Sequence, residues 1–87
     1  MTRYDALLSR ILRGDSDAAI PFNSLRYLLR RFEFDERIRG DHYIFTKENV
    51  VEILNLQPRG RYAKPYQVRQ VRGVLVKYRL AGGEHAK

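Results

Sequence analysis

One histidine stands where its side chain could do chemistry. His42 follows Arg39-Gly40-Asp41, which has the composition of a turn, and it opens a run of aromatic and β-branched residues typical of a strand. An imidazole can accept or donate a proton near neutral pH, which suits general acid–base catalysis. A strand histidine with no function would have the same context, so both interpretations stay open at this point. The other histidine, His85, falls in a polar C-terminal tail that we expect to be frayed.

A lysine marks a second candidate position. Lys64 precedes Pro65, and proline is well suited to the first position of a helix. The free backbone N–H groups and the positive dipole end of a helix N-terminus attract anions, and a cation there is locally unfavourable unless it meets one. Lys64 is therefore a candidate phosphate ligand, with a side chain that simply points into water as the alternative.

The net charge of +7 is confined to one part of the chain. From Ile53 to Gly83 there is no acidic residue, whereas elsewhere 10 basic residues balance 10 acidic ones. Seven basic residues fall in this stretch: Arg59, Arg61, Lys64, Arg69, Arg72, Lys77 and Arg79. A one-sided positive field concentrates polyanions, which makes nucleic acid the leading partner and an acidic protein the second. A solvated surface with no partner is the remaining interpretation.

Composition excludes several classes of site. The chain has no cysteine, which rules out disulfides, Cys-based zinc sites and thiol catalysis, and favours the cytoplasm. No apolar run approaches the length of a membrane span, and the N-terminus lacks the apolar core of a signal peptide. We predict no metal and no cofactor, because the candidate carboxylates have unrelated spacings: Asp5, Asp15, Asp17, Asp35 and Glu48.

Helical periodicity predicts two helices in the first third of the chain. Over residues 4–13 apolar residues recur at helical spacing, between a threonine suited to capping and a terminating glycine. For the second helix Asn23 is the expected N-cap, with Phe22 and Tyr27 placed for a hydrophobic staple.

Alternation of polar and apolar residues predicts three strands, over residues 34–39, 42–46 and 50–56. The third has apolar residues on both faces, among them Val51 and Ile53, which favours a central strand. The polar segment 57–64 is predicted to be a loop, and a final helix is predicted over residues 65–79.

This order predicts a single α+β domain over residues 1–87. We expect residues 1–20 to form an N-terminal helical extension, 22–80 the core and 81–87 a flexible tail. A helix, three consecutive strands and a further helix is the order of a double-stranded-RNA-binding domain. We therefore expect a three-stranded antiparallel sheet packed by helices, with an extra N-terminal helix. Domains of that kind recognise the shape, 2′-hydroxyls and phosphates of RNA.

The segment Gly40-Asp41-His42-Tyr43-Ile44-Phe45 resembles the Gly-Ser-His segment of HicA toxins, the mRNA-cleaving halves of a bacterial type II toxin–antitoxin system. Lys64-Pro65 followed by Val68-Arg69 resembles the Lys-Pro start of that family's last helix. The resemblance covers about Leu25 to Leu80. It implies a double-stranded-RNA-binding-like fold, a single catalytic histidine, His42, and a HicB-like antitoxin that blocks the RNA-binding surface. This chain departs from the family in having Asp41 where a serine is usual, and in its additional first helix.

Together these features predict a metal-independent endoribonuclease that cleaves mRNA. RNA carries its own nucleophile, the 2′-hydroxyl, so cleavage needs only a proton acceptor, a proton donor and charge stabilisation. His42 would be the general acid or base and Lys64 the phosphate ligand. The predicted contacts to the RNA backbone are Arg39, Arg59, Arg61, Arg69 and Arg72. A non-catalytic RNA-binding module and a domain that docks an acidic protein are the alternatives.

Overall fold

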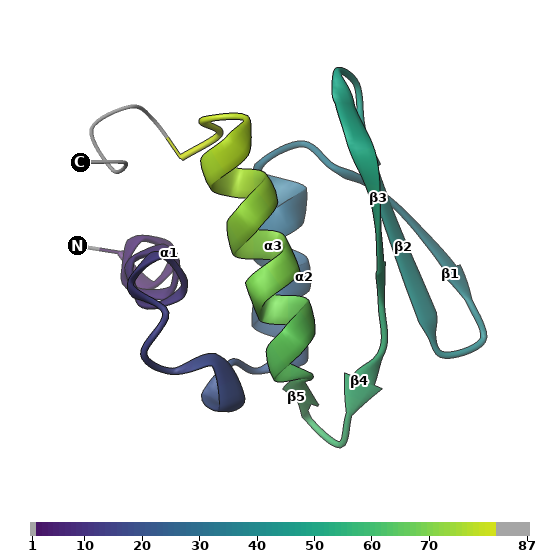
Figure 1. The fold of residues 1–87 in the computed structure, drawn as a ribbon. Helices are drawn as coiled ribbons and strands as arrows, with labels where there is room; N and C mark the ends of the chain where they lie inside the picture. Colours follow the sequence, from purple (N-terminus) through teal and green to yellow (C-terminus); the bar gives the residue numbers. More distant parts are fainter. Residues whose placement is uncertain (1, 82–87) are drawn as a thin grey trace.

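The computed structural model describes residues 2–81 of the 87. Residues 82–87, most of the predicted tail, lie outside the described part of the chain. The elements are α1 (Arg3–Arg13), η1 (Asp17–Ala19), α2 (Phe22–Arg31), β1 (Asp35–Arg39), β2 (His42–Lys47), β3 (Val50–Leu56), β4 (Pro58–Arg59), β5 (Tyr62–Ala63) and α3 (Pro65–Lys77). They form a compact α+β domain of three α-helices, a three-stranded antiparallel sheet and a small hairpin. Figure 1 shows α2 and α3 between α1 and the sheet.

The first helix has the ends that its sequence predicts. The Thr2 side chain accepts a hydrogen bond from the Asp5 N–H, and the Asp5 carboxylate accepts one from the Thr2 N–H. Gly14 ends α1 in the left-handed conformation, with φ 74°. Leu7, Leu8 and Ile11 are buried in the same core as the other helices. The apolar stripe of α1 therefore extends the core of the domain.

The predicted start of the second helix is wrong by two residues. Pro21 is the N-cap of α2, and Asn23 already lies in the first turn, where its side-chain oxygen accepts a hydrogen bond from Arg26. Two hydrogen bonds join the backbone of Ile20 and Phe22 to the β4–β5 hairpin. This pairing and the burial of Phe22 set the entry of the chain into α2.

The prediction that residues 50–56 form a central strand is also wrong. The strand order is β1-β2-β3, so β2 is central and β3 is an edge strand. Leu54 and Leu56 face the helices and are buried, whereas Val51 and Ile53 on the other face are 86% and 66% exposed. Among the described residues, no element covers that second face (Figure 1). We call it the open face of the sheet.

The last helix begins at Pro65, as predicted, and ends at Lys77. Val68, Val71, Val74 and Leu75 form its buried face. Before it, the segment predicted to be a loop contains the β4–β5 hairpin, which turns at Gly60 and places Lys64 at the N-cap of α3. No helix within residues 2–81 is both long enough and apolar enough to cross a membrane.

Candidate active site

The turn between β1 and β2 places His42 on the open face of the sheet. Gly40 has φ 60°, in the left-handed region that favours glycine, so the chain can reverse immediately before His42. Because side chains alternate along a strand, burial of Phe45 against the helices directs Ile44 and His42 to the other face. The His42 side chain is 49% exposed and so is open to a ligand.

Two neighbours hold the imidazole of His42. Its Nδ1 lies 3.1 Å from Oδ1 of Asn55, on β3. In the tautomer in which Nδ1 donates to this amide oxygen, Nε2 carries the free lone pair. On that side, an Asp41 carboxylate oxygen lies 3.7 Å from Nε2, close enough to stabilise an imidazolium ion.

A chain of hydrogen bonds leads from the lysine predicted as a phosphate ligand to Asp41, which lies beside this histidine. Lys64 Nζ donates to Gln57 Oε1 at 3.1 Å, and Gln57 Nε2 donates to Asp41 at 2.7 Å. The hydrogen bond from Gln57 is the main cause that lowers the pKa of Asp41, and the charges of His42 and Lys64 lower it further. An ionised Asp41 therefore lies between the two candidate groups, which are 22 positions apart in the sequence.

A buried glutamine contacts the backbone of the β3 end that carries Asn55 and Gln57. Gln67, on α3, is 2% exposed, and its Oε1 accepts a hydrogen bond from the backbone N–H of Gln57 at 3.2 Å. Its Nε2 approaches the backbone carbonyl of Asn55 at 3.4 Å. Gln67 thereby fixes the end of β3, from which both Asn55 and Gln57 extend.

Sequence reasoning missed Asn55, Gln57 and Gln67. A usable signal existed for the last of them: Gln67 shares helical spacing with the buried residues Val71 and Val74, and a polar residue in an apolar stripe requires a partner. Asn55 and Gln57 carried no such signal, because polar residues near a strand end are common.

The arginines predicted to contact RNA fall into two groups. Arg39 is the cross-strand partner of His42 and is exposed. Arg59 and Arg61 are exposed on the β4–β5 hairpin, in the segment that leads into Lys64. These three remain available to a ligand near the candidate site.

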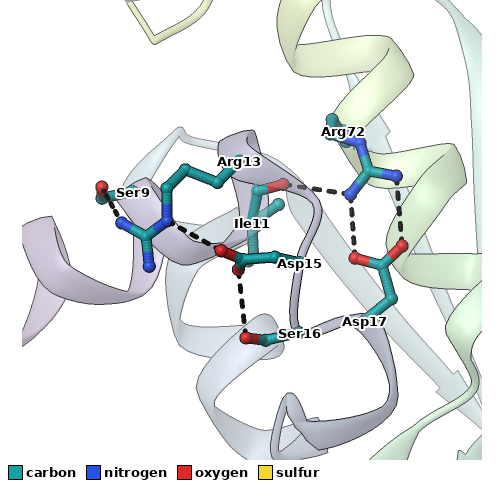
Figure 2. A network of polar contacts seen from close by, with 7 residues as sticks. All are labelled: Ser9, Ile11, Arg13, Asp15, Ser16, Asp17 and Arg72. Carbon is teal, nitrogen blue, oxygen red and sulfur yellow. Dashed lines mark hydrogen bonds and ion pairs between the residues drawn. The ribbon is translucent and has the colours of Figure 1, made fainter.

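Arg72 and Arg69 belong to the other group, because they face η1. Figure 2 shows the Arg72 guanidinium between the Asp17 carboxylate, at 2.9 and 3.1 Å, and the backbone carbonyl of Ile11, at 3.0 Å. These hydrogen bonds lower the pKa of Asp17, and the nearby charge of Arg69 contributes. Arg72 is thus already paired within the protein, and its position does not support the RNA contact predicted for it.

Acidic residues from distant segments also reduce the positive charge of the last third. Lys77 pairs with Glu52 of β3 at 2.8 Å, as Arg72 does with Asp17. The charge segregation seen along the sequence is therefore smaller in the folded protein. Five basic residues of the last third form no ion pair within residues 2–81, and three of these lie on or next to the β4–β5 hairpin: Arg59, Arg61 and Lys64, with Arg69 and Arg79 elsewhere.

Within residues 2–81, no three histidine or acidic side chains gather closely enough to hold a metal ion. The arrangement offers one imidazole with a free Nε2, one carboxylate beside it and one ammonium group, all partly open to solvent. Such a set can transfer a proton and stabilise a phosphate. Comparisons with models of known protein families, with curated proteins and with solved structures found no match.

Proposed function

We propose that this protein is a metal-independent endoribonuclease, with His42 as the proton-transferring residue. The observation that carries the proposal is the hydrogen-bonded chain from Lys64 through Gln57 to Asp41, beside His42. His42 and Lys64 were predicted on separate grounds, and the hydrogen bonds that lead from Lys64 to Asp41, beside His42, support a shared site for the two residues.

The chemistry follows from the free Nε2 of His42. A ribose 2′-hydroxyl attacks its neighbouring phosphate, and Nε2 accepts the hydroxyl proton. The Asp41 carboxylate stabilises the imidazolium ion that results, and Lys64 stabilises the negative charge on the phosphorane. The bond to the 5′ oxygen then breaks, leaving a 2′,3′-cyclic phosphate and a 5′-hydroxyl that takes its proton from solvent.

The arrangement α2-β1-β2-β3-α3, with both helices on one face of the sheet, supports a fold of the double-stranded-RNA-binding type. Together with the resemblance of the segments around His42 and Lys64 to HicA toxins, this arrangement of elements favours a HicA-like toxin that acts in the cytoplasm. A HicB-like antitoxin would then bind this protein and block the site. Asp41 occupies the position where a serine is usual in that family. Its carboxylate accepts a hydrogen bond from Gln57 and so helps to hold that side chain in place.

The test is cleavage of a long single-stranded RNA by purified protein in EDTA, beside His42→Ala. Fragments ending in a 2′,3′-cyclic phosphate should form with the wild type only. His42 is exposed, so its replacement should leave the fold and the unfolding curve unchanged. If His42→Ala cleaves at the wild-type rate, the assignment of His42 is wrong. Intact RNA that nevertheless shifts on a native gel would instead indicate a non-catalytic binding module.

A further inference from the structure

A hollow of about 380 Å³ lies on the open face of the sheet, next to His42. All three strands line it, through Asp35, Arg37, Arg39, Ile44, Thr46 and Ile53. Arg39 pairs with His42 across β1 and β2, and Ile44 pairs with Asn55 across β2 and β3. The hollow and the imidazole with its amide partner therefore share one continuous surface.

The floor of the hollow is apolar although it faces solvent. Ile44 and Ile53 each neighbour a buried residue, Phe45 and Leu54, so alternation directs both isoleucines outward. Ile53 is 66% exposed, and no described element packs on it. Clustered apolar side chains on an exposed face, bordered by charged residues, are typical of a binding surface.

The charged residues around the hollow are distributed unevenly, with basic residues toward one end and an acidic residue at the other. Arg37 and Arg39 follow β1 toward His42, and both are exposed. The single acidic residue of the lining, Asp35, pairs with Thr46 at the opposite end and lies 4.0 Å from Arg37. A phosphate is therefore attracted to the Arg39 and His42 end, and the group attached to it extends over the apolar floor.

We propose that this hollow binds the face of an unpaired nucleobase next to the phosphate held at His42. The preferred substrate is then single-stranded RNA; this inference rests on the function proposed above. In a duplex the base faces are stacked on each other and cannot reach an apolar floor, whereas an unpaired base can leave its stack and bury one face. Asp35 and Thr46 would accept hydrogen bonds from N–H groups at the base edge.

The test is fluorescence anisotropy with a labelled 2′-O-methyl oligoribonucleotide, which lacks the nucleophilic hydroxyl and stays intact. Binding is measured both for the single-stranded oligoribonucleotide and for the duplex formed by annealing it to its complement. Ile53→Ser removes part of the floor. Val51→Ser is the matched control, because Val51 is 86% exposed on the same face of β3 and lies outside the hollow. The wild type should bind the single strand at least about tenfold more tightly than the duplex. Ile53→Ser should weaken single-strand binding by about 3- to 10-fold and Val51→Ser by less than about twofold.

Equal affinities of Ile53→Ser and the wild type, or a preference for the duplex, would overturn the base-binding hollow. Cleavage of unmodified RNA, measured in parallel, separates this result from the ribonuclease proposal. His42-dependent cleavage with unaltered binding by Ile53→Ser leaves the ribonuclease and removes the hollow. Weaker binding by Ile53→Ser without cleavage by any protein keeps the hollow and removes the ribonuclease.

Discussion

Replacing Arg72 with methionine should lower the free energy of unfolding by about 2 to 3 kcal/mol. The substitution keeps most of the aliphatic stem and removes three hydrogen bonds, two to Asp17 and one to the Ile11 carbonyl. The two charged side chains are only 22% and 15% exposed. The contribution of their pairing to stability should therefore lie between two limits. An exposed ion pair contributes up to about 1 kcal/mol, and disruption of a fully buried pair costs about 3 to 5 kcal/mol.

The assay is urea unfolding followed by circular dichroism, for Arg72→Met, Asp17→Ala and the double variant. A double-mutant cycle isolates the interaction between the two side chains, and we expect a coupling of about 1 to 2 kcal/mol. RNA affinity should stay near the wild-type value for folded Arg72→Met. A coupling below about 0.5 kcal/mol, or a loss of RNA affinity at unchanged stability, would refute the reasoning and return Arg72 to the RNA-binding surface.

Three further outcomes follow from other positions. Gly73→Ala should raise the free energy of unfolding by up to about 1 kcal/mol in the urea assay, because the glycine is inside α3 and an added Cβ would meet nothing within 4 Å. Hydrogen bonds from Lys77 and Tyr78 lower the pKa of Glu52 from 4.5 to about 2. The stability that this provides is complete above about pH 4.5 and is lost toward pH 2, so Glu52→Gln should flatten the acid side of the stability profile. Asp41→Asn should raise RNA affinity by about 2- to 5-fold in low salt, measured by anisotropy, because a carboxylate beside the phosphate is neutralised.

Each of these has a distinct contrary result. A destabilised Gly73→Ala would mean that something approaches the bare backbone of α3. If the free energy of unfolding falls equally with decreasing pH in Glu52→Gln and the wild type, the carboxylate titrates alike in the folded and unfolded chains. Weaker RNA binding by Asp41→Asn would mean that the ionised carboxylate, through Gln57, is needed to place Lys64.

Hydrophobic periodicity was sufficient to locate the helices and the three main strands. The strand over residues 50–56 and the helix start at Pro65 were predicted at their observed positions. These boundaries are local, because alternation and capping residues act over a few positions. The displaced start of α2 shows where local signals fail: backbone pairing between Ile20–Phe22 and the β4–β5 hairpin sets that boundary.

Properties that depend on distant segments were not readable from the sequence. Apolar residues on both faces of β3 indicated a central strand, but Val51 and Ile53 are exposed on an edge strand. The role of Arg72 depended on Asp17, 55 positions earlier, and no periodic pattern connects them. In the candidate site, residue type singled out His42 and Lys64, whereas the neutral side chains that connect and support them became visible only in the fold.

The backbone pairing of residues 20–22 with β5 bears on the order in which the site could assemble during synthesis. His42 and Asn55 belong to one short hairpin, whose contacts can form as soon as β3 has been made. Lys64 is placed by β5 and α3, which pack on the start of α2, η1 and α1. Because a chain folds as it leaves the ribosome, a nascent chain in which α3 has not yet emerged would contain His42 and Lys64 without the helix that positions Lys64. The full hydrogen-bonded group would then form only once α3 has also emerged and packed against the rest of the domain.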